Sequence, residues 1–204
     1  DQEMIDKWGL NGHAVEPVSH TVTIICPIYK SFPAIISSLI MQTFRNWKLL
    51  LIHDGPGDGA VETFVNVIND DRIEYIETPV RMNNWGHQHR RDYINKVMSE
   101  YVLITNADNY LSPVFFEYML KPFINKNVIA SYCSQMVHSY KAWQVIECSM
   151  RRGYVDCSGV LIKTEAAKEV GWRNVTDHSA DWMFFEDLIR KFGISSFTKV
   201  RGCL

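Results

Sequence analysis

The sequence predicts an α/β fold with a mostly parallel central sheet flanked by helices and a smaller mixed part at its C-terminal end. Two observations lead to this prediction. Up to residue 110, short runs rich in β-branched residues alternate with segments whose apolar residues recur every three or four positions. After that point, strand-like and helix-like segments continue without the regular alternation. Strands that alternate with helices are typical of a parallel sheet covered on both faces.

The first strand is expected at 21–27, where the continuous run TVTIICP is typical of a strand buried on both faces. A helix follows from Pro33, because apolar residues recur there at helical spacing. The run WKLLLIHD predicts a second buried strand at 47–54. The next helix, at 61–68, has apolar residues at positions i, i+3, i+4 and i+7, which is the pattern of one buried face.

A third strand is predicted at 72–77 and a fourth at 101–106, with a helix at 88–98 between them. The buried face of that helix is expected to consist of Tyr93, Ile94, Val97 and Met98. In the second half, three strand-like runs and two helical segments are expected, at 128–137, 142–150, 156–163, 164–170 and 182–192.

Composition excludes several classes of protein. The net charge is −2 and no long basic run is present, so nucleic acid is not an expected partner. The five cysteines form no C-x-x-C pair, which favours reduced, buried thiols and a cytoplasmic location. No apolar run reaches the roughly 18 residues of a transmembrane helix. We expect one domain over 21–204, excised from a longer protein and preceded by a polar flanking arm at 1–20.

Polar side chains gather where three of the predicted strands end. The first strand ends in CPIYK, the second at Asp54, and the fourth at Asn106 and Asp108. The carboxyl ends of parallel strands meet at one edge of the sheet, where open α/β sheets bind their ligands. We therefore expect a binding site at this edge.

The segment HDGPGDGA fits two hypotheses. Gly55, Gly57 and Ala60 match the G-x-G-x-x-A fingerprint of dinucleotide-dependent oxidoreductases, and Glu77 lies about 20 residues further on, where such proteins have a ribose-binding acid. However, a strand and a helix already precede this segment, and Asp58 would put negative charge where a pyrophosphate binds.

The second hypothesis is a nucleoside diphosphate held with a divalent cation. Mg²⁺ and Mn²⁺ prefer carboxylate oxygens together with phosphate oxygens. Asp108 would supply the carboxylate, Arg90 on the preceding helix would offset phosphate charge, and Asp54 would accept hydrogen bonds from a base or ribose.

Four segments resemble, in order and spacing, the family 2 glycosyltransferases with the GT-A fold: TVTIICPIYK, MQTFRNWKLLLIHDG, HRRDYINKVMSEYVLITNADNYL and ADWMFFEDLIRKFG. The resemblance covers residues 21–193. It implies a nucleotide-binding half at 21–110 and an acceptor and catalytic half at 111–204. The implied activity is inverting transfer of a sugar from a nucleotide-diphosphate sugar, by default a UDP-sugar, to a hydroxyl group of a glycan or similar acceptor.

The resemblance also implies roles for single residues. Pro27 and Tyr29 match the P-x-Y turn beside the nucleotide, and Asp54 matches the second acid of the family's DDG motif, expected at the base or ribose. Arg90 falls at the arginine of the ARN motif. Asp108 matches the last acid of the metal-binding DxD motif, which implies Mn²⁺ or Mg²⁺ as the cofactor.

Asp181 matches the acid that the family uses as catalytic base, although the residues alone indicate only a first-turn acid favoured by the helix dipole. Cys157, Ser158 and Gly159 fall where the family contacts the donor sugar or the acceptor. Trp85 would stack on a sugar or anchor its own loop. Nothing pairs with Cys157 to lower its pKa, so we do not expect it to be a nucleophile.

The chain departs from the family pattern at three positions. His53 replaces the first acid of DDG, Arg91 replaces the asparagine after the arginine, and Asn106 replaces the first aspartate of DxD. One strong metal ligand remains instead of two. This leaves open a nucleotide-binding module without catalysis. The histidines form no metal pattern. His87 and His89, near Arg90, are expected either at the surface, which the sequence favours, or in contact with phosphate.

Overall fold

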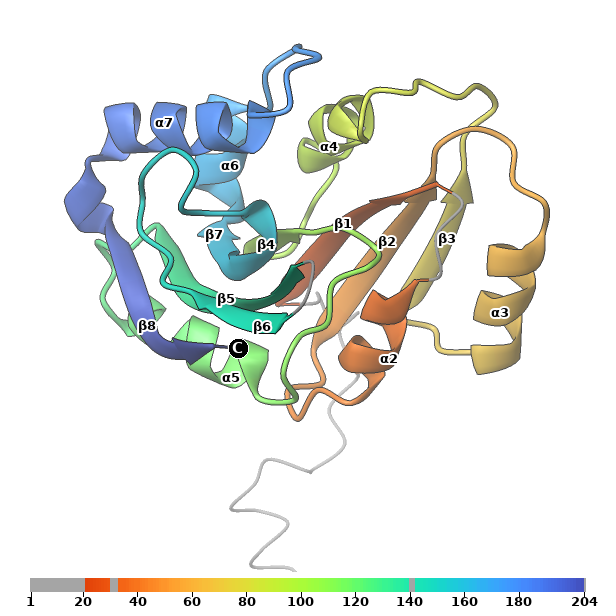
Figure 1. Ribbon diagram of the computed structural model, residues 1–204, viewed down its shortest axis with the longest axis horizontal. Helices are drawn as coiled ribbons and strands as arrows, with labels where there is room; N and C mark the ends of the chain where they lie inside the picture. Colours follow the sequence, from red (N-terminus) through yellow and green to blue (C-terminus); the bar gives the residue numbers. More distant parts are fainter. Residues whose placement is uncertain (1–20, 30–32, 140–141, 204) are drawn as a thin grey trace, which may run out of the picture.

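Figure 1 shows the computed structural model of the chain, which describes residues 21–29, 33–139 and 142–203. The predicted arm at 1–20 lies outside the described residues. In chain order the elements are β1 (Val22–Ile28), α2 (Ala34–Ile40), β2 (Trp47–His53), α3 (Ala60–Ile68), β3 (Ile73–Glu77), α4 (His87–Ile94), β4 (Tyr101–Ile104), α5 (Phe115–Leu120), η1 (Lys121–Ile124), β5 (Ala130–Ser139), β6 (Ala142–Ile146), η2 (Cys157–Gly159), β7 (Val160–Lys163), α6 (Thr164–Val170), α7 (Ala180–Phe192), η3 (Ile194–Ser196) and β8 (Phe197–Cys203).

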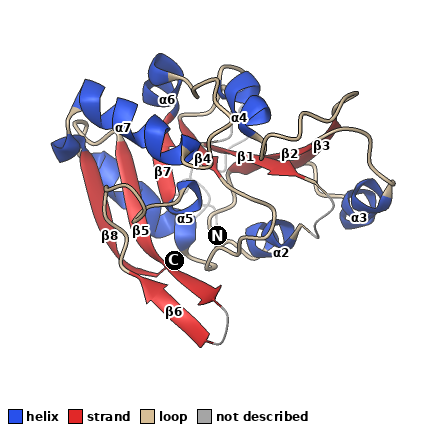
Figure 2. Cartoon of the chain, turned by 45° about the horizontal axis from the view of Figure 1, so that its top comes forward, coloured by secondary structure: helices blue, strands red, loops and turns tan. Residues whose placement is uncertain are grey.

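The strands form a sheet in the order β3-β2-β1-β4-β7-β5-β6, and β8 pairs with β5. Strands β1 to β4 are parallel, with Ile28 opposite His53 and Ile25 opposite Ile104. Strand β7 is antiparallel to both β4 and β5, and β6 is antiparallel to β5. Figure 2 shows the parallel strands on one side of the molecule and β5, β6 and β8 on the other. The α/β class, with its mixed C-terminal part, is confirmed.

Helices cover both faces of the sheet, with α2, α3 and α5 on one face and α4, α6 and α7 on the other (Figure 1). Side chains along a strand point alternately to the two faces. In β1, Val22, Ile24 and Cys26 belong to the first hydrophobic cluster and Ile25 to the second. This two-sided burial explains why β1 reads as a continuous apolar run.

The helix expected at 88–98 ends earlier, at Ile94. The amides of Lys96 and Val97 donate to carbonyls three residues back, which tightens the chain after the helix. Val97 therefore stays buried while Met98 is 86% exposed, so the prediction that Met98 is buried was wrong.

The second half differs from prediction in two ways. The strand expected at 142–150 is shorter and comprises only β6, which ends at Ile146. All of the β6 side chains are exposed. Helix α5 was not predicted, although it buries Phe115, Phe116 and Met119 in the core. Its apolar residues follow a loop and fill little more than one turn, which is too short for a periodic signal.

Candidate functional site

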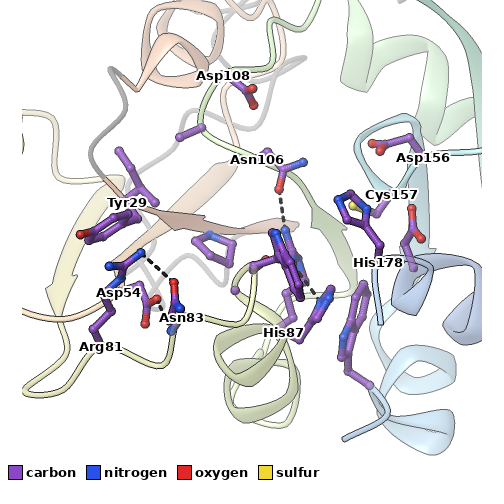
Figure 3. A pocket seen from close by; sticks show the side chains of 18 residues that line it. Tyr29, Asp54, Arg81, Asn83, His87, Asn106, Asp108, Asp156, Cys157 and His178 are labelled. Carbon is purple, nitrogen blue, oxygen red and sulfur yellow. Dashed lines mark hydrogen bonds between the residues drawn. The ribbon is translucent and has the colours of Figure 1, made fainter. Parts of the chain in front are cut away.

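A cleft of about 660 Å³ opens at the carboxyl ends of the parallel strands (Figure 3). Its walls are the ends of β1, β2 and β4, the loop that leads into α4, the turn before β7, and the segment between α6 and α7. The lining residues are Pro27, Ile28, Tyr29, Asp54, Arg81, Asn83, Trp85, Gly86, His87, Arg90, Asn106, Ala107, Asp108, Asp156, Cys157, Trp172, His178 and Asp181.

Of the residues that the sequence assigns to a nucleotide-sugar site, all but two line this cleft. The exceptions, Ser158 and Gly159, lie behind its wall. Ser158 donates through its hydroxyl and its amide to Asp156. A Cβ on Gly159 would come within 2.8 Å of the Nε2 atom of Gln135, so only glycine fits there without displacing that side chain. Both residues adjoin Cys157 but are not part of the cleft lining.

Asp54 directly follows β2, is almost completely buried and anchors the loop that leads into α4. Its Oδ1 accepts hydrogen bonds from the Met82 amide and from Nε2 of His89, both at 2.8 Å, and its Oδ2 accepts one from the Asn83 amide at 3.0 Å. Burial by itself would raise the pKa of Asp54, but these hydrogen bonds outweigh it and hold the pKa below its ordinary value. Asp54 is therefore a carboxylate with most of its acceptor capacity already used by the protein.

The loop anchored by Asp54 is conformationally strained. Asn83 and Trp85 have φ values of 52° and 54°, in the left-handed region that non-glycine residues rarely adopt. Gly86 has a φ of 78°, and a Cβ at this position would lie 2.5 Å from the Cβ of Pro27. The loop thus approaches the end of β1 closely, and the contacts of Asp54 hold it there.

Three side chains form one end of the cleft. The Arg81 guanidinium lies 3.6 Å from the centre of the Tyr29 ring, and its Nη2 donates to Oδ1 of Asn83 at 2.8 Å. Figure 3 shows Tyr29, Arg81, Asn83 and Asp54 together at this end, and Asp156, Cys157 and His178 at the other. An aromatic face with donor groups beside it is suited to a base and a ribose.

Arg90 lines the cleft beside Asn106, which lies between the two ends of the cleft in Figure 3, and is only 4% exposed. Its Nη1 donates to the carbonyl of Trp85 at 2.6 Å, and its Nη2 donates to Oδ1 of Asn106 at 2.5 Å. The Trp172 ring lies 5.4 Å from the guanidinium carbon. Within the described part of the chain, Arg90 forms no ion pair. A buried cation that opens onto a cleft without a carboxylate partner favours an anionic ligand.

Asp108 follows β4 and is the charged residue that comes next along the chain after Asn106. It is exposed, lines the cleft, and has no hydrogen-bond or ion-pair partner among the described residues. Its carboxylate and Asn106 point in different directions (Figure 3). Over 21–29, 33–139 and 142–203, no three His, Cys, Asp or Glu side chains are grouped closely enough to hold a metal ion. A cation at Asp108 would therefore need most of its ligands from a substrate or water.

Asp181 lies in the first turn of α7 and faces the cleft opposite the strand ends. Burial raises the pKa of Asp181, and the nearby Asp156 carboxylate adds to this effect, while Arg90 opposes it. Ser158 donates twice to Oδ1 of Asp156, whereas the Asp181 side chain accepts from backbone amides at the start of α7, that of Trp182 among them. Asp181 is thus a carboxylate with free lone pairs and an increased affinity for a proton.

Aromatic rings cover the side of the cleft near Asp181. The ring centres of Trp85 and His178 are 5.4 Å apart, and those of His87 and Trp172 are 5.9 Å apart in a stacked arrangement. Trp85 is 60% exposed, so part of its ring is accessible from the cleft. Burial, with a further contribution from Arg90, lowers the pKa of His87 and keeps this imidazole neutral. An exposed indole at the mouth of a cleft is suited to stacking on a sugar ring.

The glycine-rich segment after β2 is not part of the cleft lining. Gly57 donates its amide to the Glu77 carboxylate at 3.0 Å, and the Gly55 backbone approaches Arg81 closely. Ala60 begins α3 on the other side of this turn. The amide of Gly57 and the acid of Glu77, which the dinucleotide hypothesis assigns to the cofactor, therefore bind each other instead.

Several cleft residues were not identified from the sequence. Arg81 and Trp172 stand in irregular segments where no periodic pattern points to them. Of the two expectations for His87 and His89, a position at the surface was wrong, because they are 7% and 2% exposed. Helix α4 lies over the polar ends of the strands, and its inward face is therefore polar. The signal was the cluster HQHRR itself, at the start of a predicted helix beside the strand ends.

The described cysteine side chains do not suggest covalent chemistry. Cys26, Cys133, Cys148 and Cys157 are all buried, as predicted. Burial raises the pKa of Cys26 to about 12 and that of Cys157 well above its ordinary value. Neither thiol is therefore a ready nucleophile.

Comparisons with known proteins give a consistent result. The sequence model of the glycosyl transferase family 2 matches residues 23–193. A protein of Haemophilus influenzae named an uncharacterized glycosyltransferase is 22% identical over 185 residues, which are 83% of this chain and 72% of that protein. No helix among the described residues is long and apolar enough to cross a membrane.

Two solved structures have the same fold. TarS 1–349 of S. aureus in complex with UDP superposes with a TM-score of 0.70 over 90% of this chain, at 13% identity. The mannosyltransferase PcManGT of Pyrobaculum calidifontis, in complex with GDP-Man and Mn²⁺, superposes with a TM-score of 0.65 over 98% of this chain, at 16% identity. This chain spans 60% and 61% of those two chains. The likeness confirms the GT-A fold.

Proposed function

The chain belongs to glycosyltransferase family 2, and on that basis we propose that it is an inverting glycosyltransferase that moves a sugar from a nucleotide-diphosphate sugar to an acceptor hydroxyl group. The observation that carries this proposal is that Arg90 and Asp181 open onto one cleft at the strand ends. The first is a buried cation without a carboxylate partner, and the second is a carboxylate with a raised pKa.

The donor would lie along the cleft from Tyr29 to Asp181. Its base and ribose would occupy the end formed by Tyr29, Arg81 and Asn83, near Pro27 and Asp54. The diphosphate would lie over Arg90, which is the only buried arginine of the cleft lining in the described residues. We favour a UDP-sugar as the donor. The UDP and GDP-Man complexes of the two structural neighbours support a nucleotide-sugar donor without fixing the base.

A divalent cation, Mn²⁺ or Mg²⁺, would be held by Asp108 together with diphosphate oxygens. When bound, it would supply positive charge close to the leaving group. Asp108 fits this role because its exposed carboxylate has no partner in the described part of the chain. The Mn²⁺ complex of PcManGT is consistent with such a cation.

Asp181 would act as the catalytic base. Its carboxylate would take the proton of the acceptor hydroxyl while that oxygen forms a bond to the anomeric carbon. The bond between the anomeric carbon and the diphosphate would break on the opposite face, and its electron pair would leave with the diphosphate. Displacement from the opposite face inverts the anomeric configuration. The raised pKa of Asp181 supports this role, because a base must hold the proton that it collects.

The test is the release of UDP or GDP from a panel of nucleotide sugars, with sugars and glycans as acceptors. Asp181→Asn is expected to reduce transfer by about 10²- to 10⁴-fold while the affinity for UDP changes little. Glu186→Gln is the matched control, because Glu186 lies on the same helix but outside the cleft lining. Its Oε2 pairs with Nη2 of Arg190 at 3.7 Å, on the surface of the helix. A fully active Asp181→Asn protein would show that Asp181 is not the base.

The non-catalytic alternative rests on Asn106, which stands where a second carboxylate is expected. It predicts that the protein binds UDP or GDP but releases neither from any nucleotide sugar. Binding without turnover in both the unmodified protein and Asp181→Asn would therefore replace the glycosyltransferase proposal with this one.

A further inference from the structure

The contact between Arg90 and Asn106 determines the charge of the central part of the cleft. The oxygen of the Asn106 amide must face Arg90, because the guanidinium has only donors and the amide nitrogen is a donor too. The nitrogen of this amide carries hydrogens, and a metal ion on the remaining lone pair of the oxygen would lie beside the Arg90 guanidinium and be repelled by it. Asn106 is therefore a poor metal ligand in this arrangement.

The same contact leaves the charge of Arg90 uncompensated. An amide accepts the hydrogen bond of Arg90 without neutralising it, whereas a carboxylate at the same position would form a buried ion pair. The other partners of Arg90 are the carbonyl of Trp85 and, at 3.5 Å, Nδ1 of the His87 imidazole, and neither is a carboxylate. The Nε atom of Arg90 is buried and has no hydrogen-bond partner in the described part of the chain. The cleft thus holds a fixed, buried cation that forms no ion pair with a carboxylate in the described part of the chain.

This cation and a metal ion would serve the same purpose toward a diphosphate. A site with aspartate at position 106 would have two carboxylates, at 106 and 108, and one guanidinium, so it would need an added cation to accept an anionic ligand. With Asn106, the charges of Arg90 and Asp108 at the end of β4 balance before any metal is added, while the acids Asp156 and Asp181 line another wall of the cleft. Charge-assisted hydrogen bonds from a buried guanidinium to phosphate are among the strong ones.

We propose that Arg90, held in place by Asn106 as a positioning residue, is the main cation of the diphosphate site, so that nucleoside diphosphates bind to this protein without a divalent metal. The inference rests on the proposed function, because it concerns the same site. It makes a metal at Asp108 an addition to donor binding rather than a condition for it.

The test is isothermal titration calorimetry of UDP and GDP with the full chain, in EDTA and in Mn²⁺. The unmodified protein is expected to bind the same nucleotide in both conditions, with dissociation constants that agree to within about threefold, because one exposed carboxylate adds little affinity. Asn106→Asp is expected to bind about tenfold or more weakly in EDTA, because the new carboxylate pairs with Arg90 and repels the diphosphate. Mn²⁺ should restore much of the affinity of Asn106→Asp, which merely structural damage would not allow.

Asn109→Asp is the matched control. It adds the same charge three residues further along, outside the cleft, where Asn109 donates to the Thr105 hydroxyl at 3.2 Å. This variant should bind like the unmodified protein in EDTA. Thermal melts of both variants check that they are folded.

Two results would overturn the inference. If the unmodified protein binds UDP or GDP only in Mn²⁺, the metal is required and the inference fails, while the proposed function stands. If the folded protein binds neither nucleotide in either condition, the proposed function fails and the inference fails with it.

Discussion

His89 and Asp54 form a buried pair, in which Nε2 of the imidazole donates to Oδ1 of the carboxylate at 2.8 Å. The two side chains are 3% and 7% exposed. The same carboxylate binds the amides of Met82 and Asn83, so the pair joins β2, the strained loop and α4. An acid that the sequence assigned to a nucleotide thus also holds in place the loop that carries Arg81 and Trp85.

Loss of the His89 side chain should destabilise the protein. His89→Ala leaves a buried Asp54 oxygen with one donor fewer, which is expected to lower the free energy of unfolding by about 1–3 kcal/mol. Urea denaturation measures this change. His89→Gln keeps a side-chain donor and should lose less. Equal losses in the two variants would mean that the volume of the imidazole matters rather than its hydrogen bond.

The pKa of Asp181 predicts how its removal changes stability. Because burial raises this pKa in the folded state, ionisation of Asp181 destabilises the fold as the pH rises above the ordinary aspartate value of about 3.9. Asp181→Asn should therefore be more stable than the unmodified protein at pH 7, and the difference should vanish below that value. Thermal melts between pH 3 and pH 7 are the measurement; a less stable variant at pH 7 would contradict the prediction.

Asp54 should show the opposite dependence, because its pKa is lowered in the folded state. The stability that it contributes is fully present above the ordinary aspartate pKa of about 3.9 and is lost as the pH falls through the lower, folded value. Asp54→Asn should therefore be less stable than the unmodified protein at pH 7, with a difference that shrinks below pH 4. Urea denaturation across this range tests it, and a constant difference would show that ionisation of Asp54 is not involved.

The cation–π pair of Arg81 and Tyr29 should contribute to nucleotide affinity. Arg81→Met keeps an apolar contact with the ring but removes the cation, and we expect it to weaken binding of both UDP and uridine by about threefold to tenfold. Lys96→Met is the control, since Lys96 lies 4.2 Å from the Tyr93 ring outside the cleft. A loss confined to UDP would assign Arg81 to the diphosphate instead.

Trp85 should act on the acceptor side of the reaction. Trp85→Ala is expected to lower kcat/KM for a sugar acceptor by about tenfold, because a stacking surface is lost, while UDP affinity stays the same. Trp143→Ala serves as the comparison, because Trp143 is also largely exposed but stands on β6, away from the cleft. If Trp85→Ala weakened UDP binding to the same extent as transfer, Trp85 would instead belong to the donor site.

The strand ends explain why much of the cleft was predictable. Asp54, Asn106 and Asp108 each follow a run of buried apolar residues, and the register of parallel strands brings such residues to one edge whatever the rest of the chain does. Asp181 was found only through the resemblance to a family, because its local pattern is that of an ordinary helix start. Met98 was misplaced because the helix tightens after Ile94, which no hydrophobic pattern reports.

The sequence by itself determined the α/β class, the parallel half of the sheet and the edge where the cleft forms, because these follow from the periodicity of buried residues. The tertiary structure alone decided which groups meet there. Three contacts depend on how α4 and its loop lie over the strands. They are the contacts of Asn106 with Arg90, of His89 with Asp54, and of Arg81 with the Tyr29 ring. Such contacts are made by single polar side chains across large separations in sequence, and no periodic pattern encodes them.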